Sequence, residues 1–307
     1  IAMPDAADAK PQRSTDEPSP AASLVLGGLA GSLAELVTLP ALVVRTRMQV
    51  QGADPTGRQY ANFLVALRTI AREEGAAAFY KGAGWNIALT PVARGLYIGG
   101  LEAAQRTLGQ GTPARDFASG TAAQLVSSLA YVPRDVVLER CAIDGQLSSQ
   151  RGSAASTLHA LRSILSLEGL SGLYRAFVPH QVVWIPFNGM FFVALGQCKA
   201  AEEAAGIEQG YAVGVANTFV SAAIAAAATN PIDVIKTRMQ VAGANPALLG
   251  NAGAFDVAAR LLRTEGPRAF FAGLVGRFMY AGPGFALWLP TYDLLKRVWA
   301  SRASQSA

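Results

Sequence analysis

The sequence predicts an all-α membrane protein with six transmembrane helices in three similar repeats. Hydrophobic residues make up 51% of the 307 residues and charged residues only 15%, well below the roughly 25% that is usual in soluble domains. The mean hydropathy of +0.27 and the 31 glycines suit helices that pack closely in a bilayer. A pair of motifs also occurs three times along the chain, which indicates a repeat architecture.

Transmembrane helices are expected where the chain carries no Asp, Glu, Lys or Arg. These stretches are 18–34, 82–93, 117–133, 176–198, 209–232 and 278–292, and polar helix ends extend the shorter ones. They must be helical because an unpaired backbone amide in lipid is costly, and their residues lack the alternation of membrane-spanning strands. Polar segments at 45–81, 135–175 and 233–277 hold most of the Lys and Arg, so they should share one side of the membrane.

Composition excludes several classes of function. The net charge of +5 is small and scattered, so no nucleic-acid partner is expected. The two cysteines, Cys141 and Cys198, and the two histidines, His159 and His180, provide neither a disulfide framework nor a metal cluster. No nucleophile–base pair or phosphate-binding loop appears. We therefore expect neither an enzyme nor a cofactor.

A tail and three repeats make up the expected domain organisation. Residues 1–20 contain four prolines, four acidic and two basic residues, which is typical of a disordered tail. The repeats cover 21–112, 113–209 and 210–302. The first motif reads Pro-Ala-Leu-Val-Val-Arg-Thr-Arg from Pro40, Pro-Arg-Asp-Val-Val-Leu-Glu-Arg from Pro133 and Pro-Ile-Asp-Val-Ile-Lys-Thr-Arg from Pro231. The second motif is a Glu-Gly pair, at Glu74, Glu168 and Glu265, followed by aromatic, basic and small residues.

These motifs resemble those of the mitochondrial carrier family, and the resemblance covers nearly all of residues 21–302. It implies a six-helix barrel with threefold pseudosymmetry in the inner mitochondrial membrane, with one central site for a small-molecule substrate. Cardiolipin is the lipid partner that it implies. Short amphipathic helices are expected on the matrix side, and segments 60–73, 154–167 and 253–264 have the apolar spacing for them.

The resemblance also implies a matrix gate, in which the acid of one signature motif pairs with the base of the next. Asp135 would pair with Lys236, and Asp233 with Arg45. The third pair would join Leu42 to Leu138, so both of its charges are absent. Joint absence is physically reasonable, because a single unpaired charge in a closing gate would cost several kcal/mol while two apolar residues can pack.

A cytoplasmic gate is implied at the opposite ends of the even-numbered helices. The family pattern would join Lys199 to Asp293 and Lys296 to Glu102. The alternative is that these are ordinary charges near the membrane surface, whose long side chains reach for water.

Two ionisable residues within the spans are candidates for binding substrate, because a charge at that depth usually faces water or a partner. Glu35 and Arg94 could hold the ammonium and the carboxylate of a zwitterion; the alternative is that they pair with each other. Asn188 is the equivalent of Arg94 in the second repeat. The family's main contact positions carry no charge here, which suits a small, partly hydrophobic solute; they are Leu89, Thr90, Val183, Trp184, Tyr280 and Ala281.

The details of the three signatures are most similar to the branched-chain amino-acid carriers of the family, although Glu35 stands where a base is expected and Gly196 where an acid is expected. The resemblance therefore implies a carrier that works by alternating access, with a small amino acid such as a branched-chain amino acid as substrate. The alternative is a carrier-fold structural subunit of a respiratory-chain or ATP-synthase assembly. The altered motifs at positions 42, 138 and 196 motivate that alternative.

Overall fold

The protein is helical almost throughout the residues that its computed structural model describes, which are 20–53, 59–109, 113–144, 146, 157–207, 211–241 and 253–305. Among these residues there is no strand. Six long helices are α1 (Pro20–Val50), α3 (Ala83–Leu108), α4 (Pro113–Ala142), α7 (Phe177–Ala205), α8 (Tyr211–Val241) and α11 (Leu274–Gln305). The shorter elements are η1 (Gln51–Ala53), α2 (Phe63–Glu73), η2 (Ala76–Tyr80), α5 (Thr157–Leu167), α6 (Gly169–Tyr174), α10 (Ala254–Thr264) and η5 (Pro267–Phe271). The predicted tail, except Pro20, lies outside the described residues.

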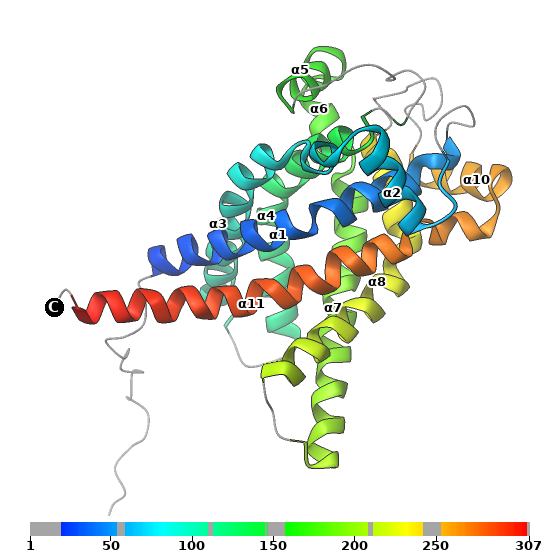
Figure 1. Ribbon diagram of the computed structural model, residues 1–307. Coiled ribbons are helices and arrows are strands. Elements are labelled where there is room, and N and C mark those ends of the chain that lie inside the picture. Colours follow the sequence, from blue (N-terminus) through cyan, green and yellow to red (C-terminus); the bar gives the residue numbers. More distant parts are fainter. Residues whose placement is uncertain are drawn as a thin grey trace, which may run out of the picture.

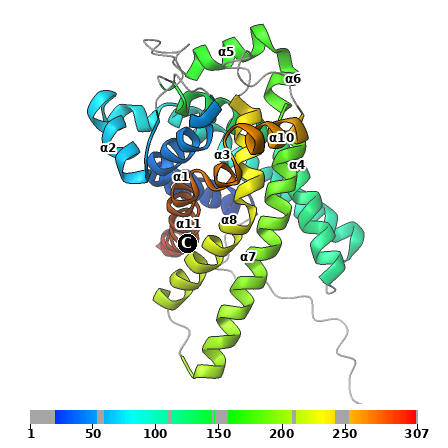
Figure 2. The same ribbon diagram turned by 90° about the vertical axis from the view of Figure 1, so that its right-hand side faces the viewer.

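The six long helices pack against one another in chain order, and the last packs against the first. Figure 1 shows α1 and α11, from opposite ends of the chain, lying side by side. The pairs α3 and α4, and α7 and α8, pack along each other, and weaker contacts join α4 to α7. The short helices α2, α5, α6 and α10 gather at one end of the bundle, uppermost in Figure 2. The predicted all-α fold is confirmed.

Three described helical stretches are long and apolar enough to cross a membrane by length and composition: Val25–Val50, Gly169–Ala205 and Ala212–Val241. The other long helices are α3, α4 and α11, which have similar lengths, and α4 and α11 carry more charged residues. With 31 residues, α1 extends about 46 Å. Because this exceeds the roughly 30 Å of a bilayer's hydrocarbon core, the helix must tilt or project from it.

The three expected amphipathic segments form α2, α5 and α10. Each of these helices buries two apolar residues one turn apart, on the face that packs against a long helix. The buried residues are Ala66 and Ile70 in α2, Ala160 and Ile164 in α5, and Val257 and Leu261 in α10. The same register in all three helices reflects the repeat in the sequence.

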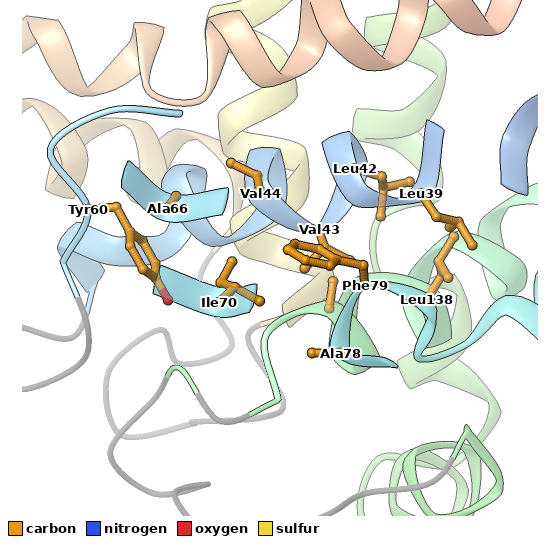
Figure 3. Close-up of a cluster of buried hydrophobic side chains, with 11 residues drawn as sticks. Leu39, Leu42, Val43, Val44, Tyr60, Ala66, Ile70, Ala78, Phe79 and Leu138 are labelled. Atoms are coloured by element: carbon orange, nitrogen blue, oxygen red, sulfur yellow. The ribbon is translucent and has the colours of Figure 1, made fainter. Parts of the chain in front are cut away.

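The signature motifs lie in the last parts of the first, third and fifth long helices, which are α1, α4 and α8. The proline of each motif is inside its helix. We call this end of the bundle the signature end; it is the matrix side by the resemblance. Figure 3 shows a hydrophobic cluster there, in which Leu39 and Leu42 of α1 lie near Leu138 of α4, with Phe79 beside them. Through this cluster, the first and second repeats make an apolar contact.

Close packing of α11 on α1 requires glycine at position 276. A Cβ at Gly276 would lie 2.9 Å from the Cα of Arg45, whereas a Cβ at Gly284, in the same helix, would meet none of the described atoms within 4 Å. We expect Gly276→Ala to destabilise the protein by about 1–3 kcal/mol, because backbone must move to relieve the overlap. Gly284→Ala is the matched control and should leave stability unchanged or raise it. Equal thermal unfolding midpoints for the two variants would contradict this packing.

Candidate functional site

A small pocket lies inside the bundle at the signature end; its volume is about 30 Å³, or about 480 Å³ when the open space around it is counted. Its lining includes all of the predicted matrix-gate residues: Leu42, Arg45, Asp135, Leu138, Asp233 and Lys236. Three predicted substrate-contact residues, Trp184, Tyr280 and Ala281, also line it. The pocket therefore brings the gate and part of the predicted contact level together.

Two ion pairs cross the signature end between different repeats. The ammonium of Lys236, on α8, is 3.2 Å from the carboxylate of Asp135, on α4. The guanidinium of Arg45, on α1, is 3.7 Å from Asp233, on α8. All four side chains are buried. At the third position, Leu42 and Leu138 belong to the hydrophobic cluster of Figure 3.

Glu35 is held mainly by a residue that the sequence reasoning missed. The guanidinium of Arg134, on α4, donates to both carboxylate oxygens of Glu35, at 2.8 and 3.0 Å, and its other nitrogen contacts Asp135 at 2.9 Å. Thr90 donates to Glu35 at 3.1 Å and accepts from Arg134 at 3.0 Å. The charge of the buried Glu35 carboxylate is therefore balanced at short range by one nitrogen of the Arg134 guanidinium, Nη1, which contacts both of its oxygens.

Arg94 is a more distant neighbour of Glu35. Their closest charged atoms are 3.9 Å apart. The Arg94 guanidinium lies over the ring of Trp288, 4.4 Å from its centroid, in a cation–π geometry. Its side chain is 22% exposed, against 6% for Arg134, and its Nε has no hydrogen-bond partner among the described residues. Arg94 therefore retains donors that can meet a ligand.

Glu35, Arg94 and the remaining predicted contact residues are outside the lining of this pocket. Thr90 and Val183 are buried, while Leu89 and Asn188 are partly exposed. Leu89, Thr90, Val183 and Asn188 are not among the residues that line this pocket.

The wall formed by α7 is aromatic. Trp184 packs edge-on against Phe187, with ring centroids 5.2 Å apart, and Phe187 stacks near Phe191 at 6.4 Å. This wall contrasts with the charged surfaces of α1 and α4, which carry Glu35 and Arg134. The interior therefore lacks the threefold symmetry of the backbone.

Glu139 is a second residue that the sequence reasoning missed. Its carboxylate is 3.0 Å from Arg45 and 3.8 Å from Lys236, and only 2% of its side chain is exposed. Both missed residues are charged where the other repeats are not. Arg134 corresponds to Ala41 and Ile232, and Glu139 to Thr46 and Thr237. A search for charges present in only one repeat would have found them.

The last arginine of each signature joins the two sequence motifs. Arg47, Arg140 and Arg238 form ion pairs with Glu74, Glu168 and Glu265, the glutamates of the second motif in the same repeats. Each arginine also donates to a backbone carbonyl of the following repeat, at Ala142, Gln240 and Gln49 respectively, over 2.7, 3.3 and 2.9 Å. We call this set the arginine ring. It links each repeat to the next and the third back to the first.

The predicted cytoplasmic gate is only half within the described side chains. The Glu102 carboxylate contacts Arg106 of its own helix at 3.4 Å and is half exposed, and Lys199 is exposed. The side chains of Asp293 and Lys296, their predicted partners, lie outside those that the structure describes. The described geometry is that of a bundle held shut at the signature end.

Threefold motifs, a ring of six long helices and a gated central pocket define a membrane transporter, and comparison with known proteins identifies its class. A family profile described as mitochondrial carrier protein matches residues 16–112, 109–202 and 210–303. The chain therefore belongs to the mitochondrial carrier family, whose members are transporters of mitochondrial membranes.

Individual relatives are similar over most of the chain. The mitochondrial substrate carrier family protein E of Dictyostelium discoideum is 31% identical over 291 residues, which cover 89% of this chain and 94% of that protein. The human mitochondrial electrogenic aspartate/glutamate antiporter is 31% identical over 285 residues, but these cover only 40% of its length. A mitochondrial adenine nucleotide transporter of Arabidopsis thaliana is 27% identical over 307 residues, covering 90% and 86%. Relatives with such different substrates leave the solute to be argued from the cavity.

Proposed function

We propose that this carrier moves a small amino acid, such as a branched-chain amino acid, across the inner mitochondrial membrane by alternating access. In this proposal the substrate binds in the central cavity, and its contacts offset the opening of one gate while the other forms. Cardiolipin is the proposed lipid partner at the matrix side.

The observation that supports this proposal most directly is the pairing of a partly free cation with a carboxylate. Arg94 would receive the substrate's carboxylate with the guanidinium donors that Glu35, at 3.9 Å, leaves open. Glu35 would receive the ammonium. Because Arg134 already contacts both Glu35 oxygens, the substrate's ammonium and the Arg134 guanidinium would both bind the Glu35 carboxylate.

The contact level supports a small and partly apolar solute. Trp184, Tyr280 and Ala281 line the pocket without bringing a charge. A solute with several negative charges would find no free cation among the described residues there, because the four cations that line the same pocket are each paired with an acid, and burying an unneutralised charge is strongly unfavourable. The side chain of a branched-chain amino acid would instead lie against the aromatic residues of α7.

Uptake of labelled leucine and valine into proteoliposomes tests the proposal. We expect Arg94→Ala to lower uptake by more than about tenfold, the usual consequence of losing a charge-assisted hydrogen bond. Arg72→Ala is the matched control, because Arg72 is an exposed cation on α2, and it should leave uptake unchanged.

The substrate proposal would be contradicted if leucine and valine uptake stayed at the level of protein-free liposomes, both with and without internal substrate. A thermal-shift screen of the detergent-purified protein against amino acids, keto acids and nucleotides would then identify the substrate class, because a ligand that binds the folded state raises its melting temperature.

A further inference from the structure

The closed signature end contains more cations than the two expected ion pairs employ. Besides Arg45 and Lys236, two further guanidiniums approach the same acids. Arg134 is 2.9 Å from Asp135, and Arg277, on α11, is 3.7 Å from Asp233. Each aspartate is therefore shared between two cations. Glu35 balances Arg134, but one more carboxylate is needed to balance the four buried cations.

Glu139 is placed to supply that charge. It is on α4, one turn beyond Asp135, and it lines the pocket. Its Oε1 is 3.0 Å from Arg45 and 3.8 Å from Lys236. The contact with Arg45 is shorter than the 3.7 Å between Arg45 and Asp233. With Glu139 ionised, the four buried cations face four buried carboxylates.

The second oxygen of Glu139 indicates a role in the gate beyond ordinary packing. Oε2 is buried and has no hydrogen-bond partner among the described residues. A buried carboxylate oxygen without a partner is costly, so packing alone does not favour an acid at this position. The other two repeats place Thr46 and Thr237 at the equivalent position, so the backbone there does not require an acid.

We propose that Glu139 is the third acidic residue of the gate at the signature end and that its carboxylate joins Arg45 of α1 to Lys236 of α8. It takes the place of the ion pair that Leu42 and Leu138 lack. The gate thus connects α1, α4 and α8 through charge, although only two of the three expected pairs are present. Glu139 acts by positioning the two cations, and it needs no contact with the substrate.

This inference rests on the proposed alternating access but not on the identity of the solute, so its test uses no substrate. Hydrogen–deuterium exchange is measured on the detergent-purified full chain for peptides that cover residues 42–50 and 233–241. We expect Glu139→Gln to speed exchange there roughly tenfold, because one buried cation loses its balance and the gate opens more often. Glu139→Thr, which introduces the residue of the other repeats, should act in the same way.

A control and a rescue make the outcome decisive. Glu203→Gln removes an exposed acid at the far end of α7 and should leave exchange at the gate unchanged. In the Glu139→Gln background, Leu42→Asp with Leu138→Lys supplies the missing ion pair and should slow exchange again.

Three results would overturn the proposal. The first is that exchange in the Glu139→Gln variant equals that of the wild type, and the second is that this variant exchanges faster throughout the bundle. The third is that the Leu42→Asp and Leu138→Lys changes fail to slow exchange at the gate, although slow exchange of residues 117–130 shows that the protein is still folded. Background leucine uptake would contradict the proposed substrate but would not alter these readings.

Discussion

An Arg47→Ala variant is expected to lose about 3–5 kcal/mol of unfolding free energy, the range found when one partner of a buried ion pair is removed. The Arg47 side chain is fully buried. It donates to Glu74 within its own repeat and to the carbonyls of Ala142 and Asp144 in the next. Its removal leaves a carboxylate and two carbonyls without this donor. Thermal and denaturant unfolding of the purified protein measure the loss.

Arg47→Lys is the matched control for geometry. A lysine keeps the charge but has no planar fork, so it cannot serve the glutamate and the two carbonyls together. We expect a loss between those of the alanine variant and the wild type. Wild-type stability in Arg47→Ala would show that the arginine ring does not hold the signature end together.

Removing Arg134 is expected to have the second largest effect. Arg134→Leu leaves Glu35 buried without the cation that contacts both of its oxygens, and Asp135 loses one of its cations. We expect a loss of about 3–5 kcal/mol in unfolding free energy. Removing both charges, in Arg134→Leu with Glu35→Gln, should cost less than the two single losses added together.

A double-mutant cycle over these two positions checks the expectation, because it isolates the coupling between the residues. A control cycle combines Arg134→Leu with Glu203→Gln, which changes an exposed acid, in place of Glu35→Gln. The losses of that pair should be additive. Additive losses for Arg134 and Glu35 would show that the contact of 2.8 Å contributes little.

Structural features that occur in all three repeats could be predicted from the sequence. Three copies of each motif align the repeats, and the resemblance to the carrier family then implies that Asp135 pairs with Lys236. The approach of their charges to 3.2 Å follows that pattern. The apolar contact of Leu42 with the cluster around Leu138 follows from the same register, because both charges are absent together.

Single-copy features could not be found in this way. Arg134 and Glu139 lie between signature positions, where the pattern allows any residue, and their partners come from other repeats. Glu35 and Arg94 were recognised as a possible pair, but the sequence could not reveal that Arg134 contacts Glu35 more closely than Arg94 does. Such choices depend on side-chain direction across the cavity, which helical periodicity does not specify.

The unequal walls of the interior have a consequence for stereochemistry. In the proposed site, a solute between α7 and the charged side chains of α1, α3 and α4 would meet an aromatic surface at Trp184, which lines the pocket, and an acid at Glu35 and a base at Arg94, which are 3.9 Å apart. Three unlike attachment points fix the handedness of a tetrahedral centre, since a mirror image satisfies only two of them at once. The proposed site would therefore favour one enantiomer of leucine over the other, and unequal uptake of L- and D-leucine is the expected result.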